Sequence, residues 1–537
     1  MRTKILSAFF FLSFITLTLQ AETKKIVFIH TNDTHSQIEP TSKSASKDPD
    51  MGGILRRKAL IDSVRNVEKN VFLVDAGDCV QGTPYFNFFK GKPEIELMNA
   101  LGYEIGTIGN HEFDNGVEAL AQMYSLAKFD IINANYDVSK TALASQIKPY
   151  VIKEIDGITV GFIGLGVNPE SLIEAKNFKG IIFHDPIEKA NKVAEQLKEK
   201  GVNVIVILSH IGFEEPGNVP DDIKLAEQSE NIDVIIGGHT HTLLPVAKKV
   251  KNKLGKDVII GQTGKSGLNV GIIAFTVAKE SKEFMNTLKY IIVGVVLYTI
   301  TACTATHYTV IENKGYTIPV TERLDASPDA SVAEIINIYK TKVDSITSRV
   351  IGQSEIAMDV ERPQSCLSNF TSDLLVETAE KNTGKKCDFG VMNIGGIRTS
   401  LPEGDITVGN ILSIFPFENS ISVITLKGKD VKDLFDIIAR RGGEGVSKQV
   451  EVKIGKDGKA YGLKINGEKI DDSRLYTIAT IDYIANGNDE LIPFKNSVSR
   501  TDLDLRLRDV MLQYIADKTA KGEKLKASLD NRLIQEK

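Results

Sequence analysis

Short apolar runs alternate with amphipathic segments along the first half of the chain. The apolar runs occupy residues 26–29, 71–74, 131–132, 160–163, 204–208 and 234–236. Between them, segments such as 52–67 and 187–200 carry apolar residues at helical spacing. Strands that are apolar throughout are buried on both faces, and strands that alternate with helices are typical of α/β folds. This pattern predicts an α/β domain with a largely buried sheet.

The second half of the chain mixes the two kinds of pattern less regularly. Helical spacing is found at 332–349, 368–381 and 431–441, among short strand-like runs. We predict a second, smaller domain of mixed α/β or α+β type. The helix at 332–349 is expected to lie in the connection that leads into it.

The chain begins with the pattern of a secretory signal peptide. Arg2 and Lys4 precede an apolar run at 5–19, and Ala21 is a small residue suited to cleavage. A buried first helix is the alternative, but the basic start and the small residues after the run favour a signal peptide. We therefore predict that residues 1–21 are removed and that the protein is exported to the periplasm or cell surface.

A second segment, 284–303, has the features of a bacterial lipoprotein signal. Met285 and Lys289 precede the apolar run 290–300, and small residues then lead to Cys303, which would carry the lipid. This interpretation suggests two coding units joined into one chain, with a lipid anchor at Cys303 after cleavage. The alternative is a buried element at a domain junction, because the run is short for an ordinary membrane span.

Both interpretations place a domain boundary in this segment. The predicted organisation is a first domain at 22–283, the apolar segment at 284–303, a linker with a helix at 304–351 and a second domain at 352–537. Two domains also suit a chain of 537 residues, because single hydrophobic cores seldom grow beyond about 250–300 residues.

Composition excludes two classes of protein. With 42% hydrophobic and 25% charged residues, the chain is not intrinsically disordered. A formal net charge of -5 does not favour polymeric nucleic acid as a partner, although small phosphorylated ligands remain compatible with it.

Of the four cysteines, Cys79 lies in a candidate metal motif and Cys303 in the apolar segment. Cys366 and Cys387 are therefore the expected disulfide pair in an exported chain.

Residue types that bind metals follow the apolar runs of the first half. They are Asp33 and His35 after the first run, Asp75 and Asp78 after the second, Asn110 and His111 after 105–108, His210 after 204–208, and His239 and His241 after 234–236. The ligand crevice of an open α/β sheet lies at the carboxyl ends of its strands, so we expect these side chains to converge. Imidazoles, carboxylates and an amide suit transition metals, and a central carboxylate can bridge two ions. For His30 we favour a structural role, as a hydrogen-bonded residue of the core or of the surface.

Five motif blocks occur in order: Asn32-Asp33-Thr34-His35, Gly77-Asp78, Gly109-Asn110-His111-Glu112-Phe113-Asp114, Ser209-His210 and Gly238-His239-Thr240-His241. Together they resemble the calcineurin-like metallophosphoesterases in their 5'-nucleotidase branch. The resemblance implies an N-terminal four-layer α/β sandwich and two divalent metal ions, Zn, Mn or similar. It implies that one ion is held by Asp33, His35 and His241, the other by Asn110, His210 and His239, and that Asp78 bridges them.

The resemblance also implies that His111, oriented by Asp114, stabilises the transition state or assists the leaving oxygen. Some members of the family carry Gln where this chain has His241. Because His is an equally sound ligand, this departure implies at most a change in metal preference.

Three motifs mark the second half: Asn393-Ile394-Gly395-Gly396-Ile397-Arg398, Phe415-Pro416-Phe417 and Tyr483-Ile484-Ala485-Asn486-Gly487-Asn488-Asp489. An arginine suits a phosphate, adjacent glycines allow a close approach of the backbone, and two aromatic rings can stack on a flat base. The motifs are similar to those of the 5'-nucleotidase C-terminal substrate domain. This similarity implies that Phe417 and Tyr483 flank the base, that Asn393 and Asp489 bind the nucleoside, and that Arg398 and Arg362 lie near the phosphate. It also implies rotation of this domain about a helical linker.

The predicted function is metal-dependent hydrolysis of nucleoside 5'-phosphates to nucleoside and phosphate by a two-metal activated hydroxide. Nucleotide-sugar hydrolysis and 2',3'-cyclic-nucleotide phosphodiesterase activity stay open, because the same metals cleave monoesters and diesters. A non-catalytic nucleotide-binding surface protein is the alternative from another class, although every expected metal ligand is retained. The expected partner is the nucleotide substrate, with no polymeric nucleic acid and no obligate protein partner.

Overall fold

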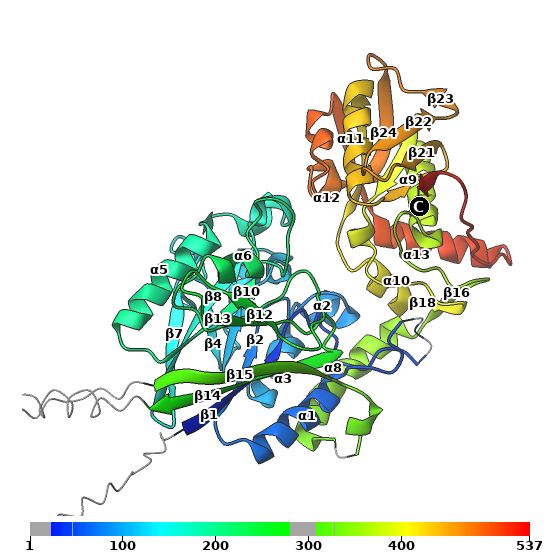
Figure 1. Ribbon diagram of the computed structural model, residues 1–537. Coiled ribbons are helices and arrows are strands. Elements are labelled where there is room, and N and C mark those ends of the chain that lie inside the picture. Colours follow the sequence, from blue (N-terminus) through cyan, green and yellow to red (C-terminus); the bar gives the residue numbers. More distant parts are fainter. Residues whose placement is uncertain (1–22, 44, 46, 280–307, 327, 537) are drawn as a thin grey trace, which may run out of the picture.

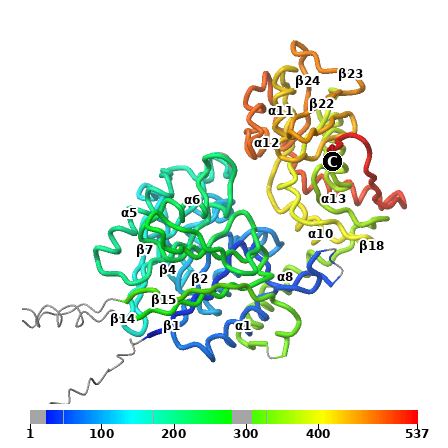
Figure 2. The backbone as a smooth tube through the Cα atoms, in the orientation of Figure 1, coloured from blue at the N-terminus to red at the C-terminus, as the bar shows by residue number. Residues whose placement is uncertain are grey.

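The computed structural model describes residues 23–536 apart from 44, 46, 280–307 and 327, and these form two domains in contact (Figure 1). The predicted signal peptide at 1–21 and the lipoprotein-like segment, including Met285 and Cys303, lie outside the described residues. Figure 2 shows the chain passing from the first domain to the second by way of helix α8 (Ala330–Thr347). Among the described residues, no helix is long and apolar enough to cross a membrane.

Two stacked sheets form the centre of the first domain. Their strand orders are β15-β14-β1-β2-β3-β4-β6 and β12-β13-β11-β10-β8-β7. The first sheet consists of β1 (Thr23–Thr31), β2 (Val71–Asp75), β3 (Ile105–Thr107), β4 (Asp130–Ile132), β6 (Ile147–Lys148), β14 (Asn269–Lys279) and β15 (Tyr308–Pro319). The second consists of β7 (Tyr150–Ile155), β8 (Ile158–Gly166), β10 (Val204–His210), β11 (Val234–Ile236), β12 (Lys248–Lys251) and β13 (Asp257–Gly261). A separate pair joins β5 (Tyr136–Asp137) and β9 (Ile182–Phe183).

Hydrophobic contacts hold four layers together. Between the sheets, the Phe28 ring of β1 lies with its centroid 6.0 Å from those of Phe72 and Phe162. The outer face of the first sheet is covered by α1 (Ile54–Val67), α2 (Pro84–Phe89), α3 (Lys92–Leu101), α4 (Val117–Tyr124) and α8, and that of the second by α5 (Pro186–Glu199) and α6 (Asp222–Glu227). The predicted four-layer α/β sandwich is confirmed. The six apolar runs that indicate the sheet, from 26–29 to 234–236, each lie within a strand.

The second domain is smaller and mixes sheets with helices. It contains a sheet of β20-β17-β24-β19-β25, a sheet of β23-β22-β21-β26 and the pair β16-β18. The strands are β16 (Val350–Ser354), β17 (Phe389–Met392), β18 (Gly404–Thr407), β19 (Ser420–Lys427), β20 (Gly445–Val446), β21 (Val450–Ile454), β22 (Ala460–Ile465), β23 (Glu468–Lys469), β24 (Leu475–Ile481), β25 (Ser499–Arg506) and β26 (Leu533–Gln535). The helices are α9 (Cys366–Thr383), α10 (Val408–Ile414), α11 (Gly428–Arg440), α12 (Asp482–Ala485) and α13 (Leu507–Ala520).

The region expected to be a linker, 304–351, contributes to the first domain over most of its described length. β15 pairs antiparallel with β14 from Asn269↔Pro319 to Lys279↔Tyr308, at the edge of the first sheet (Figure 1). Helix α8 then packs on the first domain through buried residues that include Val332 and Tyr339. The strand was not evident from its sequence because an edge strand is largely exposed and lacks a continuous apolar run.

The expected disulfide is not formed. Cys366 and Cys387 are both free cysteines. Cys366 is the first residue of α9, and Cys387 lies beyond the end of that 18-residue helix. A helix of that length spans about 27 Å, whereas the Cα atoms of a disulfide lie about 4.4–6.8 Å apart.

Candidate active site

A cavity of about 350 Å³ lies between the two domains. On the first domain it is bordered by loops that follow parallel strands: Asp78 follows β2, Asn110 follows β3, and His239 and His241 follow β11. The parallel strands β1 to β4 and β8, β10, β11 and β13 bring their carboxyl ends to this edge. The metal-type residues therefore converge where the sheet topology predicts.

One group of donors gathers around Asp33. Its Oδ1 lies 3.5 Å from Nε2 of His241 and 3.9 Å from Nε2 of His35. The two imidazole nitrogens are themselves 2.9 Å apart. Two imidazoles and a fully buried carboxylate that point at one spot form a donor set suited to a transition metal ion.

A second group lies beside it, with Asp78 between the two. Oδ2 of Asp78 lies 3.1 Å from Nε2 of His210, and Oδ1 of Asn110 lies 3.0 Å from Nδ1 of His239. Nδ1 of His210 donates to the carbonyl of Ala76 at 2.7 Å, which orients its Nε2 toward the site. That Nε2 is buried and faces the Asp78 carboxylate. A buried imidazole nitrogen that is oriented toward a carboxylate in this way fits a metal ligand.

The backbone at these positions is strained. Positive φ angles occur at Asp33 (50°), His35 (48°), Asp78 (53°), His239 (74°) and His241 (54°). Non-glycine residues seldom adopt this conformation, and such strain concentrates at functional sites. Gly109 is required here as well, because a Cβ at that position would lie 2.2 Å from Oδ1 of Asp78.

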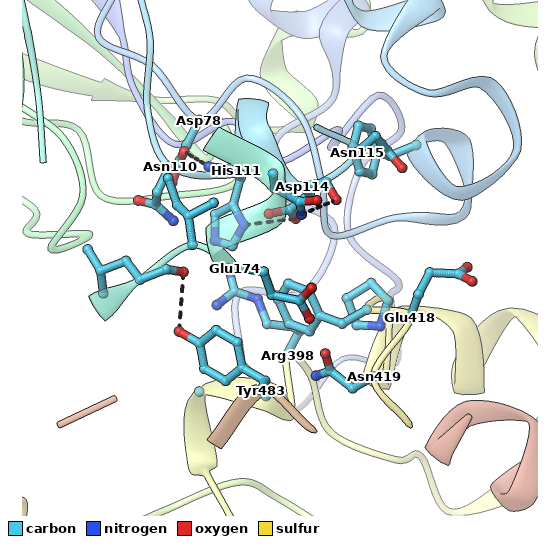
Figure 3. A pocket seen from close by; sticks show the side chains of 18 of the residues that line it. Asp78, Asn110, His111, Asp114, Asn115, Glu174, Arg398, Glu418, Asn419 and Tyr483 are labelled. Atoms are coloured by element: carbon cyan, nitrogen blue, oxygen red, sulfur yellow. Dashed lines mark hydrogen bonds and ion pairs between the residues drawn. The ribbon is translucent and has the colours of Figure 1, made fainter. Parts of the chain in front are cut away.

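His111 lies at the border of the donor cluster and the cavity, in the short helix η1 (His111–Phe113). Its Nδ1 lies 3.1 Å from Oδ2 of Asp114, and its backbone N–H donates to Oδ1 of Asp78 at 2.9 Å (Figure 3). Burial acts to lower the pKa of His111, but Asp114 and Asp78 outweigh it and the net shift is upward. The imidazole is thus held in one orientation by a carboxylate, as proton transfer requires.

Two residues that support the cluster had no role in the sequence prediction. Glu112 is buried and its carboxylate accepts the backbone N–H groups of Asp78, Cys79 and Gly109 at 3.1, 2.8 and 2.8 Å. Burial first, and Asp78 second, raise the pKa of Glu112 to about 7. Gln262 donates to the carbonyl of Gly238 at 2.7 Å and fixes the loop that carries His239. Glu112 lies within the third of the five motif blocks, whereas no sequence pattern identifies Gln262.

The second domain supplies the opposite wall of the cavity. Arg398 and Tyr483 face His111 and Asp114 across it (Figure 3). Phe417 also lines the cavity. The Phe417 ring stacks on that of His111 at 5.8 Å between centroids, and the Arg398 guanidinium lies 5.9 Å from the Phe417 centroid. Burial lowers the pKa of Arg398, and Asp78, Asp114 and Asp33 oppose that shift. The arginine of the second domain thus interacts with the carboxylates of the first.

Of the remaining residues predicted to bind substrate, some line the cavity and one lies outside its lining. Asn393 and Asp489 line the cavity, and the Asn393 amide donates to Oδ2 of Asp489 at 2.7 Å. The Tyr483 hydroxyl lies 3.1 Å from Oδ1 of Asp489 and 3.3 Å from the Leu172 carbonyl of the first domain, and its single proton can be donated to either acceptor. Arg362 is not among the residues that line the cavity. Its guanidinium pairs with Glu444 at 2.8 Å, because that fully buried carboxylate needs a cation.

His30 has the structural role that was favoured for it. The side chain is 1% exposed and packs in the first sheet, where its ring would collide with any Cβ at Gly271. Burial lowers the pKa of His30 to about 3, so the imidazole is neutral. It belongs to the core and not to the cluster of donors.

Comparison with known proteins agrees with this arrangement. Residues 26–243 match the calcineurin-like phosphoesterase family, and residues 350–496 match the 5'-nucleotidase C-terminal domain. The human 5'-nucleotidase is 30% identical over 455 residues, which cover 80% of this chain and 74% of that protein. The 5'-nucleotidase of Diplobatis ommata is 27% identical over 526 residues, or 91% of this chain and 87% of that one.

A solved structure extends the similarity to both domains together. The 5'-nucleotidase precursor from Thermus thermophilus superposes with a TM-score of 0.81 at 29% sequence identity, covering 95% of this chain and 99% of that one. The chain therefore belongs to the 5'-nucleotidase family of metal-dependent phosphoesterases.

Proposed function

We propose that the protein hydrolyses nucleoside 5'-monophosphates to nucleoside and inorganic phosphate. Its family membership makes it a metal-dependent hydrolase that acts on nucleotides. The observation that carries the proposal is that one cavity of about 350 Å³ has metal-type donors on one wall and Arg398, Phe417, Tyr483 and Asp489 on the other. This volume lies within the range of small-molecule sites.

We assign the donors to two divalent ions, Zn, Mn or similar. Asp33, His35 and His241 would hold one ion, Asn110, His210 and His239 the other, and Asp78 would bridge them. Three overlapping groups of donor atoms support this assignment: Asp33, His35 and His241; His35, Asp78 and His111; and Asp33, Asp78 and His210. Asp33, His35 and Asp78 each occur in two of these groups, so the donor atoms form one continuous cluster in which a carboxylate can serve both ions.

When bound, the two ions would neutralise the phosphoryl group and activate the attacking water. The chain's own residues then complete the reaction. Arg398 would pair with the phosphate from the second domain, while Phe417, Tyr483, Asn393 and Asp489 hold the nucleoside. As water attacks phosphorus and the P–O5' bond breaks, His111, held by Asp114, would deliver a proton to the leaving oxygen or stabilise its charge.

Phosphate release from a panel of substrates tests this function. The metal-loaded protein is expected to act fastest on nucleoside 5'-monophosphates and to lose activity when a chelator removes the metal. Nucleotide sugars and 2',3'-cyclic nucleotides release no inorganic phosphate in their first cleavage, so their hydrolysis is followed by chromatography of the nucleotide products. Faster hydrolysis of either class than of nucleoside 5'-monophosphates would replace the proposed substrate class. Nucleotide binding without release from any substrate would overturn catalysis in favour of a binding protein.

We propose further that the protein is exported and that both domains act in one compartment. Export rests on the signal-like pattern of residues 1–21. The shared compartment rests on Lys279 and Tyr308, which flank the lipoprotein-like segment and pair with each other across β14 and β15. Paired residues of one sheet cannot lie on opposite sides of a bilayer.

Mass analysis of the protein from exporting cells tests this proposal. A chain that lacks residues 1–21 is expected. Cleavage before Cys303 with an added lipid would establish the anchored form, and an intact segment would establish an exported single chain. Retention of Met1 together with a second domain that external protease cannot reach would overturn export.

A further inference from the structure

A group of charged residues lies next to the nucleoside end of the cavity but outside its lining. It centres on Glu444, whose side chain is 0% exposed. Helix α11 ends at Arg440, and Arg441, Gly442 and Gly443 then turn the chain into β20. The turn requires its glycines: they have φ angles of 79° and 113°, and a Cβ at Gly443 would lie 2.3 Å from the Pro363 carbonyl.

The Glu444 carboxylate is fully engaged. Its Oε2 accepts the backbone N–H of Ile394 at 2.6 Å. Its Oε1 lies 2.9 Å from Nε of Arg441 and 2.8 Å from Nη2 of Arg362. A buried carboxylate is costly unless charged and hydrogen-bonded partners compensate it, and here two guanidinium groups and an amide do so.

These contacts reach the cavity from two directions. Ile394 directly follows Asn393, at the end of β17, and the next residues, Gly395 and Gly396, line the cavity. Holding the Ile394 amide therefore fixes the turn that presents Asn393. On this side, Glu444 is thus hydrogen-bonded to a residue whose two chain neighbours line the cavity.

On the other side, Glu444 acts through Arg441. The Nη2 atom of Arg441 lies 4.0 Å from Oδ2 of Asp489, and Nη1 lies 3.7 Å from Oε2 of Glu490. Asp489 and Glu490 have φ angles of 53° and 62°, so this turn is strained and needs support from its surroundings. Asp489 in turn receives hydrogen bonds from Asn393 and Tyr483.

We propose that Glu444 is a positioning residue for nucleoside recognition, which acts by holding the Ile394 amide and the Arg441 guanidinium so that Asn393 and Asp489 keep their places in the cavity. Neither Glu444 nor Arg441 is among the residues that line the cavity. The inference rests on the proposed function only in that a nucleoside binds at Asn393 and Asp489.

Glu444→Gln and Arg441→Ala test the inference through the split between KM and kcat. Both variants are expected to raise KM for a nucleoside 5'-monophosphate about tenfold, as the loss of one charged hydrogen bond predicts, with kcat changed less than about twofold. For a phosphate ester that has no base, kcat/KM is expected to stay at the wild-type value. The double variant is expected to lose no more than the worse single variant, because the two residues act through each other.

Asp388→Asn is the matched control. Asp388 accepts the Thr477 N–H at 2.8 Å and pairs with Arg474 at 2.8 Å, so it combines the same kinds of bond. It precedes β17, whereas Asn393 follows that strand. The control is expected to keep the wild-type KM. An equal rise in KM for all three single variants would show a general loss of domain stability and overturn the inference.

Other results would also overturn it: an unchanged KM in Arg441→Ala, or an equal loss on the nucleotide and on the ester without a base. Arg441→Ala decides the outcome if Glu444→Gln does not fold. Calorimetric binding of a nucleoside to the same variants separates this inference from the proposed function. A wild-type protein that binds nucleosides without releasing phosphate would refute catalysis, while weaker binding by both variants would still support the role of Glu444.

Discussion

Glu112→Gln should weaken both the fold of the first domain and its hold on metal. Oε2 of Glu112 accepts the N–H groups of Asp78 and Gly109, and Oε1 accepts that of Cys79. A glutamine has one oxygen, so in either orientation its NH2 group faces at least one buried N–H donor. A buried donor left without an acceptor costs about 1–3 kcal/mol, and we expect that loss in the free energy of unfolding.

Glu94→Gln is the matched control for this change. Glu94 is 4% exposed and Glu112 is 3% exposed. Burial raises the pKa of Glu94 to about 7, as it does for Glu112. The Glu94 carboxylate, however, does not hold backbone N–H groups of other loops as Glu112 does. Its replacement by glutamine removes a buried charge and leaves no such backbone donor without an acceptor, so stability at pH 8 should be unchanged or higher.

Unfolding at pH 8, with and without added metal, provides the measurement. Each kcal/mol lost should lower Tm by roughly 2–4 °C for a domain of this size. The affinity of the Glu112→Gln protein for metal should also fall about 10- to 100-fold, because the loops that carry Asp78 and Asn110 lose their shared anchor. Equal stability losses in the two variants, or normal metal affinity in Glu112→Gln, would refute the role given to the three N–H bonds.

Three further outcomes test the assignment of roles in the cavity. Asp78→Asn is expected to lower kcat on the order of 100- to 1000-fold and to reduce bound metal while the fold survives; wild-type activity with a full complement of metal would contradict the bridging role. His111→Ala should lower kcat about 100- to 10000-fold with little change in KM, whereas Phe417→Ala and Tyr483→Ala should raise KM for nucleotides about 5- to 150-fold. If all three variants lose the same activity on a phosphate ester that has no base, stacking of the base on Phe417 and Tyr483 is excluded. Removal of metal by a chelator should abolish phosphate release, and Zn or Mn should restore it; activity that persists in metal-free protein would contradict metal dependence.

The part of the fold that the sequence predicts best is the part buried on both sides. Val204 to His210 is apolar up to its last two residues and is strand β10, with His210 at its carboxyl end. Such strands are continuous apolar runs, and the ligands follow them directly. Strand β15 falls within the expected linker, because its position at a sheet edge leaves exposed residues that interrupt the apolar pattern.

The residues that hold the site together were harder to predict than those that face the cavity. Glu112, Gln262 and Glu444 act by accepting or donating bonds to backbone groups that are distant in sequence, such as the Ile394 N–H 50 residues away from Glu444. No residue type or spacing marks such a contact before the loops are in place. Arg362 shows the converse. The family resemblance implies a place near the phosphate for its guanidinium, but in the structure the guanidinium pairs with the buried carboxylate of Glu444.

The pairing of β14 with β15 holds the first sheet together by hydrogen bonds between strands, and these bonds do not depend on the chain between residues 279 and 308. Main-chain bonds along the whole of β15, together with the packing of α8, tie everything after Tyr308 to the first domain. A strand added to a sheet edge is recognised in the same way whether or not it is covalently joined to its neighbour. A cut between residues 279 and 308 would therefore create two complementary fragments, the second donating its own strand to the first. Co-purification of separately made 23–279 and 308–537 pieces, with phosphate release restored, would show that the active site reassembles in trans.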